Sequence, residues 1–133
     1  MKEFETLALT DNLPEVLAFV DEQLESAGCP MKVQMQIDIA VEEIFVNISH
    51  YAYGDGSGTA KLRFENTGSG AAITFIDSGV PYDPLAKADP DITLSAEERE
   101  IGGLGIFMVK KTMDDVSYKY IDGHNILTLK KGW

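Results

Sequence analysis

Hydrophobic and polar residues follow two kinds of spacing along the chain. Alternation at every second residue predicts strands, and recurrence every three to four residues predicts helices. In KEFETLAL near the start, Phe4, Leu7 and Leu9 alternate with more polar neighbours, a pattern that predicts a strand, which we expect at the edge of a sheet. Apolar residues at helical spacing follow in LPEVLAFVDEQLESAG, which closes at Gly28. The three residues before it are candidate N-caps: Thr10, Asp11 and Asn12. We therefore expect an edge strand followed by an amphipathic helix.

A second and longer helix is expected from about Met31 to Tyr53, where the glycine cluster GDGSG marks a flexible turn. Projected at about 100° per residue, its core face is predicted to be one apolar stripe, which consists of Ile37, Val41, Ile44 and Ile48. Further apolar residues lie nearly opposite this stripe: Met35, Ile39 and Val46. Two apolar faces require two covers, so either the first helix or a partner is expected on the second face.

The remaining patterns predict two hairpins, a long loop and a third helix. TAKLRFENT and GAAITFIDSG form the first hairpin, and VSYKYIDGHNILTLKKGW forms the last one, turning at Asp122 and Gly123. Residues 84–101 contain two prolines and several acids and are expected to form a loop. GGLGIFMVKKTMDD then enters a helix through glycines. No internal repeat divides the chain, so we expect a single domain over residues 1–133.

Composition and charge narrow the function classes. The chain has 133 residues, enough for one core without disulfides, and its 44% hydrophobic and 25% charged residues are typical of a soluble globular domain. No segment is apolar enough for a membrane span, and the net charge of −11 opposes binding to nucleic acid. The start of the chain lacks a signal-peptide pattern and Cys29 has no disulfide partner, so we expect a cytoplasmic protein.

The second predicted helix carries polar residues among its apolar ones in the segment AVEEIFVNISHYAYGDGSG. Glu43 and Asn47 are four residues apart, so their side chains lie one turn apart beside the core stripe and can reach a single ligand. A solvated flank of the helix is the alternative interpretation.

The strand before the long loop ends in FIDSGVPYDP. Asp77, at the end of an apolar strand, can accept a hydrogen bond from an exocyclic amine such as that of adenine, and Gly79 lets the backbone approach a ring. The same residue types also make an ordinary turn. This segment by itself leaves both interpretations open.

The third candidate stretch is GGLGIFMV, from Gly102 to Val109, where glycines lead into a helix. The amide groups at such a helix start, together with the helix dipole, can bind phosphate. Glycines also serve tight loops. The chain lacks the Gly-Lys-Ser/Thr of a P-loop, HExxH and paired CxxC, so neither a P-loop nor a zinc site is expected.

Taken in this order, the three stretches resemble the histidine-kinase-like ATPase superfamily, which has the Bergerat ATP-binding fold. YAYGD, PYDPL and GGLGIFMVKKTMDDV are most similar to the anti-sigma-factor serine/threonine kinases of bacterial partner-switching systems. The resemblance implies an α/β two-layer sandwich, with a mixed, mostly antiparallel sheet and helices on one face. It also implies that residues 84–101 form a lid over bound ATP.

The resemblance implies roles for individual residues. Glu43 would be the general base, and Asn47 would hold the Mg2+ that bridges the phosphates of ATP or ADP. Asp77 would accept the adenine amine, with Gly79 beside the ring. The other implied nucleotide-binding residues are Tyr51 on the adenine side, Arg99 in the lid, Thr128 in support of Asp77, and a phosphate cradle of Gly102, Gly103, Leu104, Gly105, Ile106 and Phe107. Glu42 is expected to be solvated only.

The chain departs from the family pattern at two of these positions. Tyr51 stands where the family often has histidine, in YAY instead of HAY. In the family, an arginine close before the glycines often reaches the terminal phosphate, and here Arg99 lies three residues before Gly102. Lys87 is the other cation of the expected lid.

The function implied by the resemblance is that of an ATP-dependent serine/threonine protein kinase and anti-sigma-type regulator. Such a protein would phosphorylate a small anti-anti-sigma partner and could also bind a sigma factor. The alternative is a nucleotide-binding regulatory module that docks to a sigma factor or a phosphatase without catalysis. Related kinases commonly pair, and the first strand is expected at an exposed edge, so we also predict a homodimer.

Overall fold

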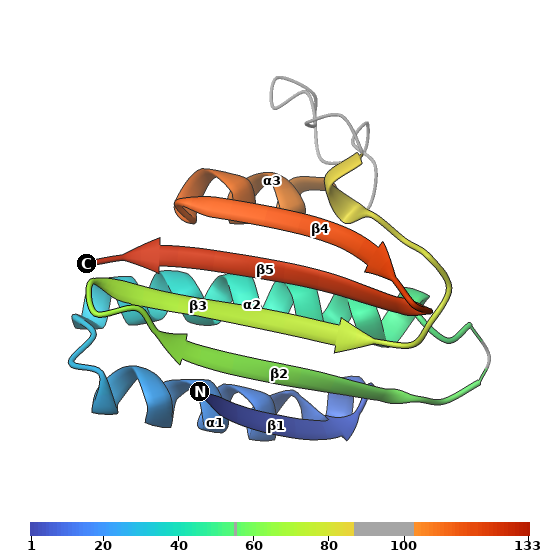
Figure 1. The fold of residues 1–133 in the computed structure, drawn as a ribbon, viewed down its shortest axis with the longest axis horizontal. Helices are drawn as coiled ribbons and strands as arrows, with labels where there is room; N and C mark the ends of the chain where they lie inside the picture. Colours follow the sequence, from blue (N-terminus) through green and yellow to red (C-terminus); the bar gives the residue numbers. More distant parts are fainter. Residues whose placement is uncertain (55, 87–102) are drawn as a thin grey trace.

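The computed structural model describes residues 1–54, 56–86 and 103–133 (Figure 1). Its strands are β1 (Lys2–Leu7), β2 (Thr59–Asn66), β3 (Gly70–Asp77), β4 (Asp115–Ile121) and β5 (His124–Gly132). Its α-helices are α1 (Leu13–Ser26), α2 (Met31–Tyr51) and α3 (Gly103–Thr112), and its short 3-10 helices are η1 (Thr10–Asn12) and η2 (Pro84–Ala86). Every strand and α-helix expected from the sequence is present.

The strands form one sheet in the order β1-β2-β3-β5-β4, and each neighbouring pair within the described residues is antiparallel. The three α-helices lie on one face of this sheet, which gives the molecule two layers (Figure 1). The predicted two-layer α/β sandwich is therefore confirmed, and β1 lies at an edge of the sheet as expected.

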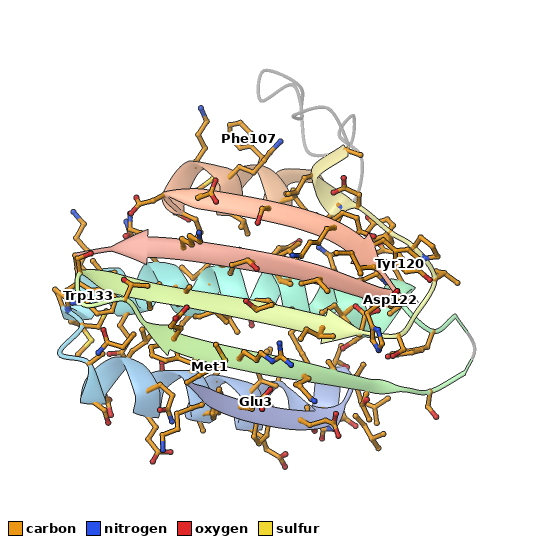
Figure 2. The ribbon with its side chains drawn as sticks, viewed as in Figure 1. Met1, Glu3, Phe107, Tyr120, Asp122 and Trp133 are labelled. Atoms are coloured by element: carbon orange, nitrogen blue, oxygen red, sulfur yellow. The ribbon has the colours of Figure 1, made fainter. Side chains whose placement is uncertain are left out.

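One end of the sheet brings together segments that are far apart in the sequence. Asp77 at the carboxyl end of β3 pairs with Asn125 at the start of β5. The hairpin between β4 and β5 turns at the same end through Asp122 and Gly123, which have φ angles of 53° and 81°. Tyr120 lies beside this turn (Figure 2). The polar residues of the candidate site gather at this end.

The core lies between the sheet and the helices because alternate strand residues point inward. In β5 the buried residues are Asn125, Leu127 and Leu129, and the residues between them are partly exposed. The predicted core stripe of α2 is buried at Ile37, Val41 and Ile44, whereas Ile48 is partly exposed. No helix in the described parts of the chain is long and apolar enough to cross a membrane.

Three details of the helices differ from the sequence predictions. Asn12 does not cap α1, because its side-chain amide donates a hydrogen bond back to the carbonyl of Leu7 at 3.1 Å. The second helix ends at Tyr51, and Tyr53 beyond it donates its hydroxyl to the carbonyl of Thr59 at 2.6 Å. The second apolar face of α2 is not covered by α1: its residues Met35 and Ile39 are 59% and 61% exposed.

Where α1 packs against α2, the carboxyl groups of Asp21 and Asp38 meet. One oxygen of each is buried and lacks a hydrogen-bond donor when both groups are charged. Burial, followed by the hydrogen bond and the negative charge of Asp21 and by the charge of Glu25, raises the pKa of Asp38 to about 7. Asp38 therefore loses its proton near neutral pH, and the contact between the helices then contains two like charges.

Candidate functional site

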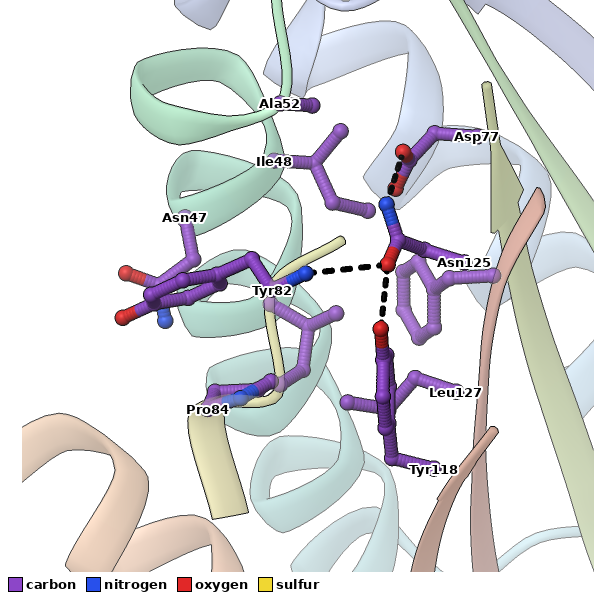
Figure 3. Close-up of a pocket in the computed structure, with 11 residues that line it drawn as sticks. Asn47, Ile48, Ala52, Asp77, Tyr82, Pro84, Tyr118, Asn125 and Leu127 are labelled. Atoms are coloured by element: carbon purple, nitrogen blue, oxygen red, sulfur yellow. Dashed lines mark hydrogen bonds between the residues drawn. The ribbon is translucent and has the colours of Figure 1, made fainter. Parts of the chain in front are cut away.

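A narrow cavity lies where β3 ends and β5 begins, against the second half of α2 (Figure 3). Its wall is mostly apolar with a few polar groups, and consists of Ile44, Asn47, Ile48, Ala52, Phe75, Asp77, Tyr82, Pro84, Tyr118, Asn125 and Leu127. Such a wall is typical of a small-molecule site. The cavity volume is about 30 Å³, too small for a purine ring, so the wall would have to open for one to enter.

Asp77 and Asn125 are the buried polar residues of the described parts of the chain, each only 6% exposed. One carboxylate oxygen of Asp77, Oδ1, accepts a hydrogen bond from the backbone amide of Gly79 and another from the side-chain amide of Asn125, both at 2.9 Å. Asp77 therefore lies at the inward-facing end of an apolar strand and lines the cavity, where its carboxylate can accept a hydrogen bond.

The expectation that Thr128 supports Asp77 is wrong. The Thr128 hydroxyl pairs with the Thr74 hydroxyl at 3.2 Å, on the face of the sheet that the helices do not cover. Asn125 is the residue that faces Asp77, and the sequence reasoning missed it. The sequence contained a signal for Asn125. It lies two and four residues before the inward-facing Leu127 and Leu129, so it points to the same face of the strand, whereas Thr128 lies between them and points outward.

Gly79 is expected beside the adenine ring, and in the structure its backbone lies close to the end of α2. A Cβ atom at this position would lie 2.1 Å from the carbonyl oxygen of Ala52, just after α2. The backbone amide of the next residue, Val80, donates to the same carbonyl at 2.8 Å. A side chain at position 79 would therefore separate the end of α2 from the end of β3, and with them two walls of the cavity.

Glu43 of α2 lies against the first turn of α3. A Cβ atom on Gly105 would lie 2.1 Å from the carboxyl carbon of Glu43, so glycine is what leaves room for the carboxylate. Burial, and then the charge of neighbouring Glu42, raises the pKa of Glu43 above its usual value, and the side chain of Asn47 partly opposes this rise. A half-buried carboxylate with a raised pKa is a stronger base than usual, as proton abstraction requires. Glu42 is exposed, as expected.

Asn47 lies one turn after Glu43 and lines the cavity. Its side-chain nitrogen is buried and makes no hydrogen bond of good geometry within the described residues, although it lies close enough to the Glu43 carboxylate to lower the pKa of that group. Buried polar atoms are nearly always hydrogen-bonded in folded proteins. The Asn47 amide therefore has bonding capacity left for a bound group, and its carbonyl oxygen is of the type that binds hard cations.

The predicted phosphate cradle coincides with the start of α3, which begins at Gly103. The first four amide groups of a helix lack partners inside it, which includes those of Leu104 and Gly105. Phe107 is the fifth residue of α3, so its amide is used within the helix, which argues against its expected role. The Phe107 ring projects from α3 (Figure 2). The ammonium group of Lys111 lies over this ring, 5.3 Å from its centre, in a cation–π contact. Ile106 is buried in the core, only 6% exposed.

Tyr51 lies next to the cavity without lining it. Its ring packs on the ring of Tyr82, with 5.3 Å between the centres, and Tyr82 is part of the cavity wall. The structure thus brings Asn47 and Asp77 to one cavity and Glu43 to the start of α3. Arg99 and Gly102 lie outside the described residues.

Comparison with known proteins identifies the family. A family model described as the histidine kinase-like ATPase domain matches residues 6–131. The serine/threonine-protein kinase BtrW of Bordetella bronchiseptica is 27% identical over 99 residues, which are 74% of this chain and 70% of that protein. The serine-protein kinase RsbW of Listeria monocytogenes is 27% identical over 109 residues, which are 78% of this chain and 69% of that protein.

A solved structure shares the fold. The crystal structure of the RsbU and RsbW domains of a Mycobacterium tuberculosis protein matches 99% of this chain with a TM-score of 0.63 at 15% identity. This chain spans 32% of the chain in that structure, so the likeness concerns the fold of one part of it. The chain therefore belongs to the histidine-kinase-like ATPase family, as its sequence predicted, and within that family it is similar to serine-protein kinases.

Proposed function

We propose that this chain is an ATP-dependent serine/threonine protein kinase that phosphorylates a small anti-anti-sigma-type partner and acts as an anti-sigma-type regulator. Family membership already implies nucleotide binding. The observation that supports a kinase is the contact of Glu43 with Gly105, which puts a half-buried base beside the helix start where phosphates would bind. A module that only docks has no need of a base at this position.

The two ends of ATP would be recognised separately. Asp77 would accept the amine of adenine inside the cavity, next to the apolar side chains of Ile48 and Phe75. The amides of Gly103, Leu104 and Gly105 at the start of α3 would bind phosphate oxygens, favoured by the helix dipole. Phosphoryl transfer depends mostly on such positioning and charge stabilisation.

Glu43 would take the proton from the hydroxyl of the partner's serine or threonine. As that proton moves to the carboxylate, the hydroxyl oxygen forms a bond to the terminal phosphorus, and the bond from this phosphorus to the bridging oxygen of ADP breaks. The raised pKa of Glu43 suits this step, since a base works best when its pKa lies near the working pH.

Asn47 is the residue that would hold magnesium. The fit is good because Asn47 lines the cavity, has an oxygen ligand and has an amide that is not fully hydrogen-bonded within the described residues. Those residues contain no group of three or more acidic, histidine or cysteine side chains that could enclose a metal. This suits magnesium, which usually binds through one or two protein oxygens and the phosphates. Magnesium held there would supply positive charge against the charge on the phosphates.

A protein substrate fits the surface next to Glu43. An exposed apolar strip on α2, formed by Met35 and Ile39, leads directly to the proposed base Glu43. These residues and Asn47 lie on one face because they are spaced four residues apart. Beside it a groove between α2 and α3 is lined almost wholly by apolar atoms, from Gln36, Ile39, Ala40, Met108, Val109 and Thr112. A partner domain with an apolar surface beside its acceptor hydroxyl would cover this strip. The open edge of β1 supports the further proposal of a homodimer.

The test is transfer of labelled phosphate from ATP to purified anti-anti-sigma-type domains encoded near the gene. Glu43→Gln keeps the size of the side chain and removes the base, so transfer should fall by about 10²- to 10⁴-fold while ATP affinity is kept. Glu42→Gln, an equal change at the exposed neighbour, is the matched control and should transfer at close to the wild-type rate. Binding of ATP and partner without transfer, or normal transfer by Glu43→Gln, would favour the docking module instead.

A further inference from the structure

We infer that Asn125 is a positioning residue that determines specificity for adenine: it holds Asp77 so that one carboxylate oxygen remains free to accept the amine of the base. This inference rests on the proposal that the cavity binds ATP. The family resemblance implied no role for Asn125. Its role is inferred from its hydrogen bond to Asp77 and its other contacts in the cavity wall (Figure 3).

The side-chain amide of Asn125 uses its full hydrogen-bonding capacity. Its nitrogen donates to Oδ1 of Asp77 at 2.9 Å and to the carbonyl of Val80 at 2.8 Å. Its oxygen accepts from the backbone amide of Tyr82 at 3.1 Å and from the hydroxyl of Tyr118. An amide has two donor hydrogens and two acceptor lone pairs, so four partners saturate it. A buried and saturated amide has a single orientation.

The orientation of the Asn125 amide is fixed because its hydrogen-bond partners cannot switch between donating and accepting. The backbone amide of Tyr82 can only donate, so the oxygen of Asn125 must face it and the nitrogen must face Asp77. Burial raises the pKa of Tyr118 above its usual value, so its hydroxyl keeps its proton and donates to the same oxygen. Asp77 is consequently always presented with an N–H donor by Asn125.

The consequence for Asp77 is that its two oxygens differ. Oδ1 accepts from both Gly79 and Asn125 and is fully engaged toward the protein. Oδ2 has no hydrogen-bond partner within the described residues, and Asp77 lines the cavity. A free carboxylate oxygen accepts the amine at position 6 of adenine, whereas guanine has an acceptor oxygen there that it would repel. A site built to bond an N–H group rejects analogues that lack it.

Asn125 also links this oxygen to the rest of the wall. Through Tyr118 it reaches β4, and through Val80 and Tyr82 it reaches the segment that follows β3. Tyr82 packs on Tyr51, and Tyr118 lines the cavity beside Leu127. Asn125 therefore joins the end of β3, the segment after it and β4 at one point of the cavity wall.

The experiment compares two nucleotides that differ by one amine: ATP and purine riboside triphosphate, which has hydrogen in place of the 6-amino group. Dissociation constants are measured by calorimetry for the wild type and for three variants whose folding is checked first. A hydrogen bond to a charged acceptor corresponds to about a 10- to 100-fold preference, so the wild type should prefer ATP by that factor. In Asn125→Asp an oxygen replaces the N–H that faces Asp77, and the preference should fall toward one.

Two further variants separate positioning from folding. Tyr118→Phe keeps the ring and removes one bond to Asn125, so it should reduce the preference partly even if Asn125→Asp does not fold. Thr128→Val is the control, a change of similar size on the outward face of β5, and should leave the preference unchanged. If the variants weaken binding of both nucleotides equally, Asn125 is only structural and the inference is overturned.

The wild type decides whether the inference or the proposed function is at fault. Binding of both nucleotides with equal affinity by the wild type would mean that Asp77 does not read the amine, which overturns the inference and leaves ATP binding intact. Binding of neither nucleotide would remove the proposed function itself.

Discussion

Gly105 tests whether the position of Glu43 matters as much as its chemistry. Gly105→Ala adds one methyl group in the first turn of α3. The added Cβ would lie 2.1 Å from the carboxyl carbon of Glu43 and 2.2 and 2.3 Å from its two oxygens. Unstrained contacts of this kind need about 3.5 to 4.0 Å. The carboxylate must therefore retreat by roughly 1.5 Å.

The size of the effect follows from that distance. A general base must lie within about 2.6 to 3.2 Å of the group whose proton it takes, and a misplacement of about 1 Å can cost roughly 10²-fold in rate. We expect phosphate transfer by Gly105→Ala to fall by about 10²-fold or more. Thermal stability should be kept or should rise, since alanine favours a helix over glycine by up to about 1 kcal/mol and the displaced group is the flexible end of a side chain.

The assay combines the initial rate of transfer to the partner, ATP affinity by calorimetry and the melting temperature. The matched control is the same substitution in the Glu43→Gln background. If Gly105→Ala acts through Glu43, it should add little to the loss already caused by Glu43→Gln, as in any cycle of two coupled residues. A Gly105→Ala protein that transfers phosphate at the wild-type rate would refute the reasoning, because Glu43 would then not need its place against α3.

Two further predictions concern other parts of the molecule. Asp38 holds its proton up to about pH 7 when folded but releases it at ordinary acidic pH when unfolded, so its ionisation lowers stability as pH rises toward 7. Asp38→Asn should therefore raise the melting temperature most above pH 7, by an amount that shrinks as pH falls toward about 4, and a gain independent of pH would contradict this reading. Ile39→Asp should lower transfer to the partner with ATP affinity unchanged, whereas equal transfer would show that the partner docks elsewhere.

The sequence by itself determined the elements and their order. Alternation in KEFETLAL and in the two hairpins, helical spacing in α1 and α2, and glycines at the start of α3 all depend on neighbours within a few residues, and these elements are present in the structure. The order of the three motif stretches also predicted the family. Glu43 and Asn47 could be paired in advance because one turn of one helix joins them.

Tertiary structure decided which residues from different elements meet. Strand register places Asn125 opposite Asp77 and turns Thr128 to the other face, and a shift of one residue would reverse the faces toward which the two side chains point. The contact of Glu43 with Gly105 depends on how α3 packs on α2, and no local pattern specifies that distance. Periodicity identifies the inward face of each element, but the partner across the core is fixed only when the packed sheet and helices set their register and separation.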